Sequence, residues 1–373
     1  DEITEQLGQI VSRTELQKID PRNFRPLIDN QIDNRMFGPL TQGQTFDLFA
    51  DEPAFSITLI FGNYLNGLNE VRDQIDHLAA LSFDISTHVW NKRIIGPEQC
   101  ASIDLLEMAV TKTFSKRTQG GASYAVIDML PAGDDLSPQE VVNSLDKRLS
   151  KKFRGKHKGK LFILINSTDT LNWYSSGVDI SFSPIITEHY LHLWTSDGIA
   201  HVLDDLKKGP TAEAIQTILD ETYGHHLLVV EFLNSLPPNK EITSTIIGQC
   251  AESLRKKIGN EQSKYFDWAG IAALPSSLKH AMAEVIVALM DSSKSSLTFE
   301  DELLSLIVEE LRSNSSEPSG SDLHGIVDTI SESSISNWMR AMGHTLPAHN
   351  NRVSMSRIAY DLYASFKASG PDS

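Results

Sequence analysis

The feature that most constrains the fold is a strand, turn and helix pattern built around two glycines. An apolar, β-rich run spans Phe55 to Phe61, and Gly62 follows it directly. Gly67 comes after four intervening residues, and Asn69 to Leu81 then carries apolar residues at helical spacing. Glycine supplies the backbone freedom that a tight turn needs. The pattern therefore predicts a buried strand that turns directly into a helix, as in α/β proteins.

The spacing of these glycines matches the phosphate-binding P-loop, G-x-x-x-x-G-K-[ST]. In that pattern, backbone N–H groups and the helix dipole hold phosphates, while the lysine and the hydroxyl serve the terminal phosphates and Mg²⁺. Here Leu68 stands at the lysine position and Asn69 at the Ser/Thr position. We predict a P-loop-type fold without the side chains of phosphate chemistry. The alternative is an ordinary glycine turn between a strand and a helix.

A second segment shows the same kind of loss. The run Leu161 to Leu171 (LFILINSTDTL) resembles the Walker B strand of AAA+ and STAND-type ATPases, in which apolar residues precede Asp-Glu-x-Asp-x-Leu. The resemblance puts Asn166 at the position of the magnesium-organising aspartate and Ser167 at that of the water-activating glutamate. Asp169 keeps the spacing of the second aspartate.

A third match falls where these ATPases have a helical lid. The run Thr222 to Leu228 (TYGHHLL) resembles their Thr-Gly-Gly-His-Pro-Leu-Leu turn, which implies that Gly224 and His225 lie in a lid turn. Together the resemblances imply a degenerate AAA+/STAND-type ATPase fold. That fold is α/β, a P-loop-type parallel sheet flanked by helices, with a helical lid and a C-terminal helical or winged-helix module.

The alternation of strand and helix patterns supports a parallel sheet covered on both faces. The expected strands are Phe55–Phe61, Phe83–Trp90, Tyr124–Met129, Leu161–Ile165 and Val178–Ser183. The expected domains are an N-terminal arm (1–45), the degenerate P-loop domain (46–205), the lid (206–270) and a C-terminal helical or winged-helix-like domain (271–373). Ser331 to Gly343 has the pattern of a recognition helix, but the last domain has 7 basic and 13 acidic residues, which disfavours DNA reading.

Charge limits the partners. The formal net charge is −16, which repels polyanions from most of the surface. One segment opposes this trend, with eight basic residues within 147–160: Lys147, Arg148, Lys151, Lys152, Arg154, Lys156, Lys158 and Lys160. This segment is either a solvated helix end that balances local acidity or a patch for phosphate backbones or an acidic partner. It has one aromatic residue, Phe153, so base stacking has little support.

The cysteines and histidines argue against metal and disulfide frameworks. Cys100 and Cys250 form no CxxC pair, so we expect an intracellular protein, cytoplasmic or nuclear, without a cysteine-based zinc site. No apolar run is long enough to span a membrane. His189 and His192 are three residues apart, but the zinc-hydrolase pattern HExxH is absent, and no metal site is expected.

We therefore expect a catalytically inactive, ATPase-like scaffold or regulatory subunit without a cofactor. Its expected partner is another protein or an intact ATPase relative, with nucleic acid as a second partner through the basic segment, and no membrane. One alternative is ATP or ADP binding without hydrolysis. Another is an enzyme of a different class, for which the candidate groups are Asp169, His189, His192, His225 and Glu231.

Overall fold

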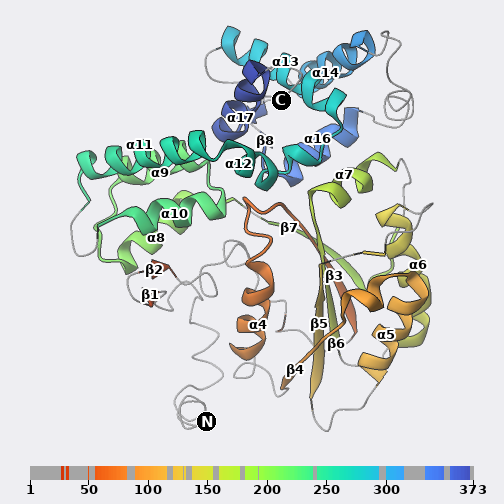
Figure 1. Cartoon of the computed structure of the whole chain (residues 1–373). Coiled ribbons are helices and arrows are strands. Elements are labelled where there is room, and N and C mark those ends of the chain that lie inside the picture. Colours follow the sequence, from red (N-terminus) through yellow and green to blue (C-terminus); the bar gives the residue numbers. More distant parts are fainter. Residues whose placement is uncertain are drawn as a thin grey trace.

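A computed structural model gives the fold of the chain (Figure 1). It describes residues 27–28, 31–32, 49, 55–81, 89–115, 121–128, 130–131, 137–153, 159–176, 181–191, 193–237, 242–293, 300–314, 332–347 and 353–369. Near the N-terminus, two short antiparallel strands, β1 (Leu27–Ile28) and β2 (Gln31–Ile32), form a hairpin.

A five-stranded parallel sheet forms the centre of the α/β region. Its strands are β3 (Ser56–Phe61), β4 (Trp90–Arg93), β5 (Ala122–Ile127), β6 (Gly159–Ile165) and β7 (Ile186–Tyr190), in the order β4-β5-β6-β3-β7. All four neighbouring pairs are parallel. The three inner strands are buried along almost their whole length and are mostly apolar, because helices cover both faces of the sheet. The predicted α/β fold with a parallel sheet is confirmed.

The two faces of the sheet have separate cores. Helix α4 (Val71–Leu81) covers one face, and α5 (Ile103–Ser115) and α6 (Pro138–Phe153) cover the other, as Figure 1 shows. A short 3-10 turn, η4 (Pro97–Cys100), leads into α5. Side chains of β3 alternate between the two cores: Ile57, Leu59 and Phe61 pack with α5 and α6, and Ile60 packs on the side of α4.

The position predicted for the fifth strand is wrong. Residues 181–183 are not in a strand, and 177–180 lie outside the described residues. The strand instead runs from Ile186 to Tyr190 and pairs with β3. This strand lies at the edge of the sheet and its side chains are only half-buried or exposed, so it carries Thr187, Glu188 and His189 and lacks an apolar run. The predicted strand before Trp90 also falls partly outside the described residues, since 82–88 are not described and β4 begins at Trp90.

The chain after the sheet is helical. Helix α8 (Ser196–Asp205) comes first, and the region predicted as the lid (206–270) then contains α9 (Ala212–Thr222), α10 (His226–Ser235), α11 (Ser244–Asn260) and the short α12 (Gln262–Trp268). The 3-10 turn η5 (Ile271–Ala273) follows. We call α8 to α12 the lid helices. Three of these helices begin at a threonine whose hydroxyl accepts a hydrogen bond from a first-turn N–H group: Thr195, Thr211 and Thr243. Such caps stabilise a helix start by about 1 kcal/mol each.

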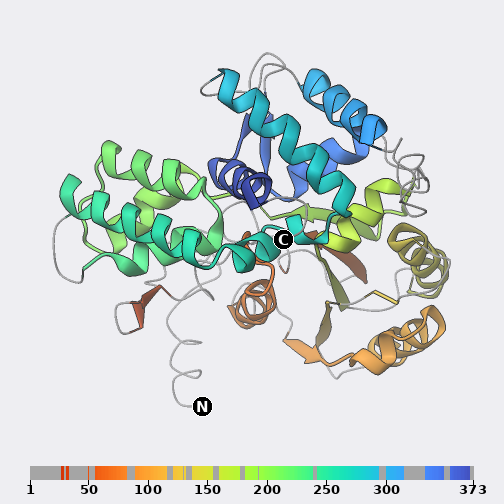
Figure 2. The same ribbon diagram turned by 45° about the horizontal axis from the view of Figure 1, so that its top comes forward.

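The C-terminal region consists of helices and a small hairpin. It contains α13 (Ser276–Ser293), α14 (Glu300–Asn314), α16 (Glu332–Ala341), β8 (Thr345–Pro347), β9 (Val353–Met355) and α17 (Arg357–Ser369), and β8 and β9 are antiparallel. These helices lie above the carboxyl ends of the sheet strands (Figure 1) and beside the lid helices (Figure 2). Lid and C-terminal region share one continuous apolar core, which also takes in Leu65 from the turn after β3. No helix among the described residues is long and apolar enough to cross a membrane.

Candidate functional site

The candidate site lies where the chain leaves two neighbouring strands in opposite directions. From β3 the chain passes through α4 to β4 on one side, and from β6 it passes through α7 (Ser167–Ser175) to β7 on the other side of β3. The register pairs Phe61 with Ile165, so the turns after both strands lie at the same edge. Ligands of open parallel sheets bind in such crevices.

A cleft opens at this point. Its volume is about 240 Å³, and it is lined by Asn63, Tyr64, Leu68, Asn166, Ser167, Thr168, Asp267, Ala272 and Ala273. The structure therefore brings the two sequence-predicted segments together in one site, and it adds a wall from α12 and η5. Among the described residues, the lining contains one carboxylate, Asp267, and neither lysine nor arginine. Phosphate binding depends on cations or free N–H donors, and this lining supplies no cation.

The backbone N–H groups of the loop are hydrogen-bonded to oxygen atoms of the protein. Four consecutive residues, 65 to 68, all donate their N–H groups to protein oxygens. The bonds run from Leu65 to the carbonyl of Trp268 (3.0 Å), from Asn66 to the Asn63 side chain (2.7 Å), from Gly67 to the carbonyl of Tyr64 (3.0 Å) and from Leu68 to the carbonyl of Asn63 (3.1 Å). In a P-loop these donors point at phosphate oxygens. Here the same N–H groups donate to oxygen atoms of the protein.

Leu68 and Asn69 have different environments. The Leu68 side chain is buried and belongs to the apolar core beneath α4, together with Val71 and Ile75. Asn69 is exposed. Gly67 has φ +88°, a left-handed conformation that glycine adopts without strain. Gly62 lies against Leu191, since a Cβ there would be only 2.5 Å from Leu191 Cδ1. The glycines keep their role in the turn, and the lysine position is part of the core.

Asn63 connects the loop to the lid and to the C-terminal region. Its Nδ2 group donates to the carbonyls of Ala269 and Met342, both at 3.0 Å, and its Oδ1 accepts the N–H of Asn66. Ala269 ends α12, and Met342 ends α16. Asn63 is almost completely buried. One amide thus holds the ends of two helices against the loop.

Asn66 extends this connection to the lid turn. Its Nδ2 donates to the Met342 carbonyl (3.2 Å), which leaves Oδ1 to face Nδ1 of His225 at 2.6 Å. An amide oxygen only accepts, so Nδ1 of His225 carries the proton. The other ring nitrogen, Nε2, then accepts from the Ser356 hydroxyl at 3.2 Å. Ser356 follows β9, so this chain of hydrogen bonds runs from the loop through the lid turn to the C-terminal hairpin.

A second histidine completes this set, which we call the loop latch: Asn63, Asn66, His225, His344 and Ser356. His344 Nε2 donates to the Ala269 carbonyl (2.9 Å), and the N–H of Ser356 donates to the His344 carbonyl (2.7 Å). Burial, with a smaller contribution from His344, lowers the pKa of His225 to about 3. Burial likewise lowers the pKa of His344 to about 4, against the opposing effect of its bond to Ala269. Both rings are therefore neutral at pH 7.

The segment after β6 stabilises the start of α7 and its contact with α16. Asn166 is the N-cap of α7, and its Oδ1 accepts the N–H of Asp169 at 2.9 Å. Burial raises the pKa of Asp169, and its hydrogen bond with Asn166 opposes that effect. The carbonyl of Ser167 accepts a bond from the indole of the buried Trp338 (3.2 Å). The predicted recognition helix, α16, thus packs with Trp338 against α7.

The sequence reasoning missed Asp128, which follows β5 at the same edge of the sheet. Its carboxylate forms an ion pair at 2.8 Å with Arg72 in the first turn of α4. A carboxylate directly after a buried strand was the available signal. Both side chains of this ion pair are exposed, so it is a surface contact. Among the described residues, no group of three His, Cys, Asp or Glu side chains could hold a metal.

Gly224 shapes the lid turn. It has φ +76°, and a Cβ there would be 2.5 Å from the carbonyl oxygen of Trp194. Its own carbonyl accepts the N–H of Trp194 at 2.7 Å. Only glycine fits this close backbone approach.

The groups considered for an unrelated enzyme have separate partners. His225 belongs to the loop latch, and Asp169 is bound by the cap of α7. Glu231 accepts hydrogen bonds from Lys257 and Tyr265. His189 lies on the edge strand β7, and His192 lies outside the described residues. The Arg255 side chain is 55% exposed, and its Nε donates at 2.6 Å to the buried carboxylate of Glu221.

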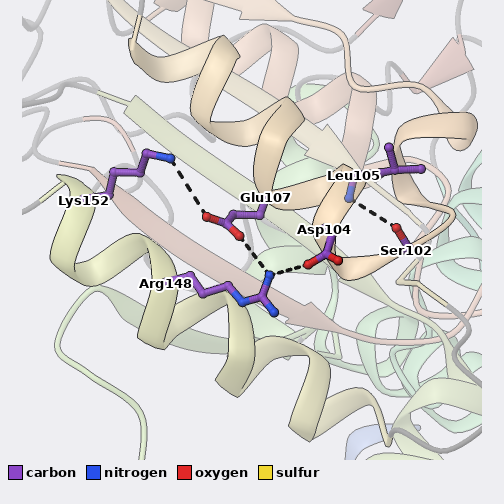
Figure 3. Close-up of polar contacts among 6 residues, drawn as sticks. All are labelled: Ser102, Asp104, Leu105, Glu107, Arg148 and Lys152. Carbon is purple, nitrogen blue, oxygen red and sulfur yellow. Dashed lines mark hydrogen bonds and ion pairs between the residues drawn. The ribbon is translucent and has the colours of Figure 1, made fainter.

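The basic segment is less basic in the structure than in the sequence. Figure 3 shows Arg148 bound to Asp104 (2.6 Å) and Glu107 (2.9 Å), with Lys152 4.0 Å from Glu107. Lys160 is buried, with its ammonium 5.9 Å from the centre of the Trp90 ring. Lys147 and Lys151 are exposed on α6. Arg154, Lys156 and Lys158 lie outside the described residues.

Comparisons with known proteins give the following results. No protein-family model and no curated protein sequence matches the chain. Among solved structures, the Aeropyrum pernix ORC2 protein (ADPNP–ADP complexes) aligns with a TM-score of 0.44 and 8% identity over 93% of this chain and 97% of that chain. The Aeropyrum pernix ORC1 protein in complex with DNA aligns with a TM-score of 0.37 and 12% identity over 87% of this chain and 92% of that chain. A STAND protein with a tetratricopeptide repeat sensor from Pyrococcus horikoshii aligns with a TM-score of 0.30 and 11% identity over 87% of this chain and 42% of that chain. With TM-scores this low, the functional argument rests on the geometry of this chain.

Proposed function

We propose that the chain is a catalytically inactive, ATPase-like protein that works as a scaffold or regulatory subunit through assembly with other proteins. The observation that carries this proposal is the use of the loop N–H groups of residues 65–68 by protein oxygens. Phosphoryl transfer depends almost entirely on positioning and on neutralising charge. The loop here has neither a lysine nor free donors at these four positions, and the charged side chain among the described residues that line the cleft is the carboxylate of Asp267.

The proposal also gives the loop a purpose. Its two asparagines bind the ends of α12 and α16 and the lid turn, so the loop latch joins the α/β region, the lid and the C-terminal region without a ligand. Such a protein offers partners a surface whose shape does not depend on nucleotide. The expected partner is another protein or an intact ATPase relative, and no cofactor is required.

Titration of ATP and ADP into the protein, with and without Mg²⁺, tests the proposal. We expect no heat in calorimetry and no thermal shift at millimolar nucleotide, beside a competent P-loop ATPase as positive control. Magnesium-dependent micromolar binding, or hydrolysis that is abolished by Asn63→Ala, would contradict the proposal. The Asn69→Ala variant is the matched control because Asn69 is exposed.

A second candidate function is nucleotide binding without hydrolysis. The cleft favours it, because the exposed aromatic ring of Tyr64 and the Asn166 side chain line one crevice at the carboxyl edge of the sheet. These groups suit a nucleoside better than a phosphate chain. The same titration separates the two functions: weak, magnesium-independent binding of ATP, ADP and adenosine with similar affinities supports the second.

A further inference from the structure

Exposed apolar side chains concentrate in one stretch of the described chain. Ile94, Leu105 and Met108 are exposed by 85%, 40% and 61%, although the helix α5 that carries the last two has a well-packed inner face. Leu105 and Met108 are three residues apart, so they are neighbours on the outer side of the helix. A partner that covers these two side chains would gain the free energy of burying their apolar surface.

An ion-pair cluster lies beside these two side chains. Arg148 and Lys152 of α6 bind Asp104 and Glu107 of α5 and hold the two helices together. In Figure 3, Leu105 points away from these ion pairs, on the far side of Asp104 from Arg148. Leu105 and Met108 therefore form a small apolar area on α5 beside the charged cluster.

Three further lysines give this surface a positive excess. Lys112 on α5 and Lys147 and Lys151 on α6 are exposed, and none has an ion pair among the described residues. With Arg148 and Lys152 there are five cations against the two carboxylates of the cluster. The chain as a whole has a net charge of −16. We call this region the α5–α6 surface: Leu105, Met108, Lys112, Lys147 and Lys151, together with the ion-pair cluster.

We propose that the α5–α6 surface docks an acidic, amphipathic segment of a partner protein. Carboxylates of the segment pair with Lys112, Lys147 and Lys151, and its apolar side chains cover Leu105 and Met108. The inference rests on the proposed scaffold role, for which it names the chemistry of the partner.

Two other occupants fit the surface less well. Nucleic acid gains nothing from Leu105 and Met108, and the carboxylates of Asp104 and Glu107 repel its phosphates. A second copy of the chain in a two-fold dimer would place the same excess of lysines on both sides of the interface, because such an interface is self-complementary.

The test is selection from a random peptide display library against the purified full chain. We expect the selected peptides to be acidic and amphipathic. Fluorescence anisotropy with a labelled selected peptide should then show at least about tenfold weaker binding to L105S/M108S and to K147E/K151E. Ile94→Ser and Lys256→Glu are the matched controls, an exposed apolar residue and an exposed lysine outside the surface, and they should bind the peptide unchanged. All substituted side chains are exposed, so thermal melts should show that each variant is folded.

Several results would overturn the inference. One is a selection that yields no acidic amphipathic peptides. Another is selected peptides that bind both double variants as tightly as they bind the native chain. Duplex DNA is tested in the same assay. If it binds the native chain and L105S/M108S but not K147E/K151E, the surface is assigned to nucleic acid. A failure here leaves the nucleotide titration unaffected, so the scaffold proposal is judged separately.

Discussion

The Asn66 amide oxygen and Nδ1 of His225 lie 2.6 Å apart, although 159 residues separate them in the sequence. This bond joins the turn after β3 to the turn that begins α10. Both side chains are buried, so this bond links the sheet directly to the lid helices.

The first prediction concerns this bond. Asn66→Ala removes the acceptor of His225 and one donor to the Met342 carbonyl, both in a buried site. Each buried polar group left without a partner costs about 1–3 kcal/mol. We expect the free energy of unfolding, measured by urea denaturation, to fall by about 2–4 kcal/mol. Asn69→Ala, at an exposed position of the same loop, should stay within about 0.5 kcal/mol of the native value. Equal effects of the two substitutions would refute a latch at Asn66.

The second prediction concerns the close approach of the C-terminal region to the loop. Gly343 has φ +70°, and a Cβ there would be 3.2 Å from Asn66 Nδ2, His225 Cε1 and Leu193 Cδ2. Gly343→Ala is therefore expected to destabilise the protein by about 1–3 kcal/mol through backbone strain and displacement of the latch.

Gly248 provides the matched control for this change. It lies inside α11, and a Cβ there meets nothing within 4 Å. Gly248→Ala should raise the free energy of unfolding by about 0.5–1 kcal/mol because alanine favours the helix. Thermal melts of the two alanine variants should move in opposite directions, and a shift in the same direction would count against the strain argument.

Much of the α/β fold could be predicted because it follows from local patterns. The runs at Phe55–Phe61 and Leu161–Ile165 are strands with apolar residues on both faces, and such runs are visible in sequence. The strand β7 could not be found in this way, because an edge position lets Glu188 and His189 face solvent or lie half-buried. Its place in the sheet depends on pairing with β3, which is a tertiary contact.

The candidate site could be predicted only in part. The glycine spacing pointed to the loop, and the resemblance to AAA+ and STAND-type motifs pointed to Asn166 and His225. The structure brings the loop and Asn166 to one cleft, and it joins the loop to His225 by a hydrogen bond. The parts of the latch from the C-terminal region, Ser356 and His344, carry no sequence signal of their own. Their role depends on the path of the chain over the sheet edge, which no local pattern encodes.

The third prediction is that restoring the motif residues does not restore nucleotide binding. Leu68→Lys with Asn69→Thr recreates the pattern G-x-x-x-x-G-K-T, but Leu68 is buried in the core beneath α4. The substitution removes the apolar contacts of Leu68, and the new lysine must leave the core or stay uncharged. We expect the free energy of unfolding to fall by about 2–5 kcal/mol. The loop N–H groups stay bound to protein oxygens. Calorimetry should show no ATP binding by the folded variant, and tight magnesium-dependent binding would mean that the loop rearranges freely.

The last prediction follows from three buried histidines. Burial lowers the pKa values of His225 and His226 to about 3 and of His344 to about 4, below the ordinary value of 6.5. Nδ1 of His226 accepts a bond from the Trp194 indole at 3.0 Å, which also requires a neutral ring. Because the unfolded chain binds protons at these rings near pH 6.5 and the folded chain does not, stability rises with pH throughout this window.

We therefore expect the free energy of unfolding to be constant above pH 7 with respect to these groups and to fall as the pH drops from 6.5 towards 4. Each ring contributes a loss of about 2 kcal/mol by pH 5, at about 1.4 kcal/mol per pH unit, so three rings remove much of the typical stability of a domain. Urea unfolding at several pH values measures this, and His226→Asn should reduce the slope between pH 6 and 5 by about one proton. A flat profile between pH 7 and 5 would show that the rings titrate in the folded protein, and the latch would then not be a sealed, neutral network.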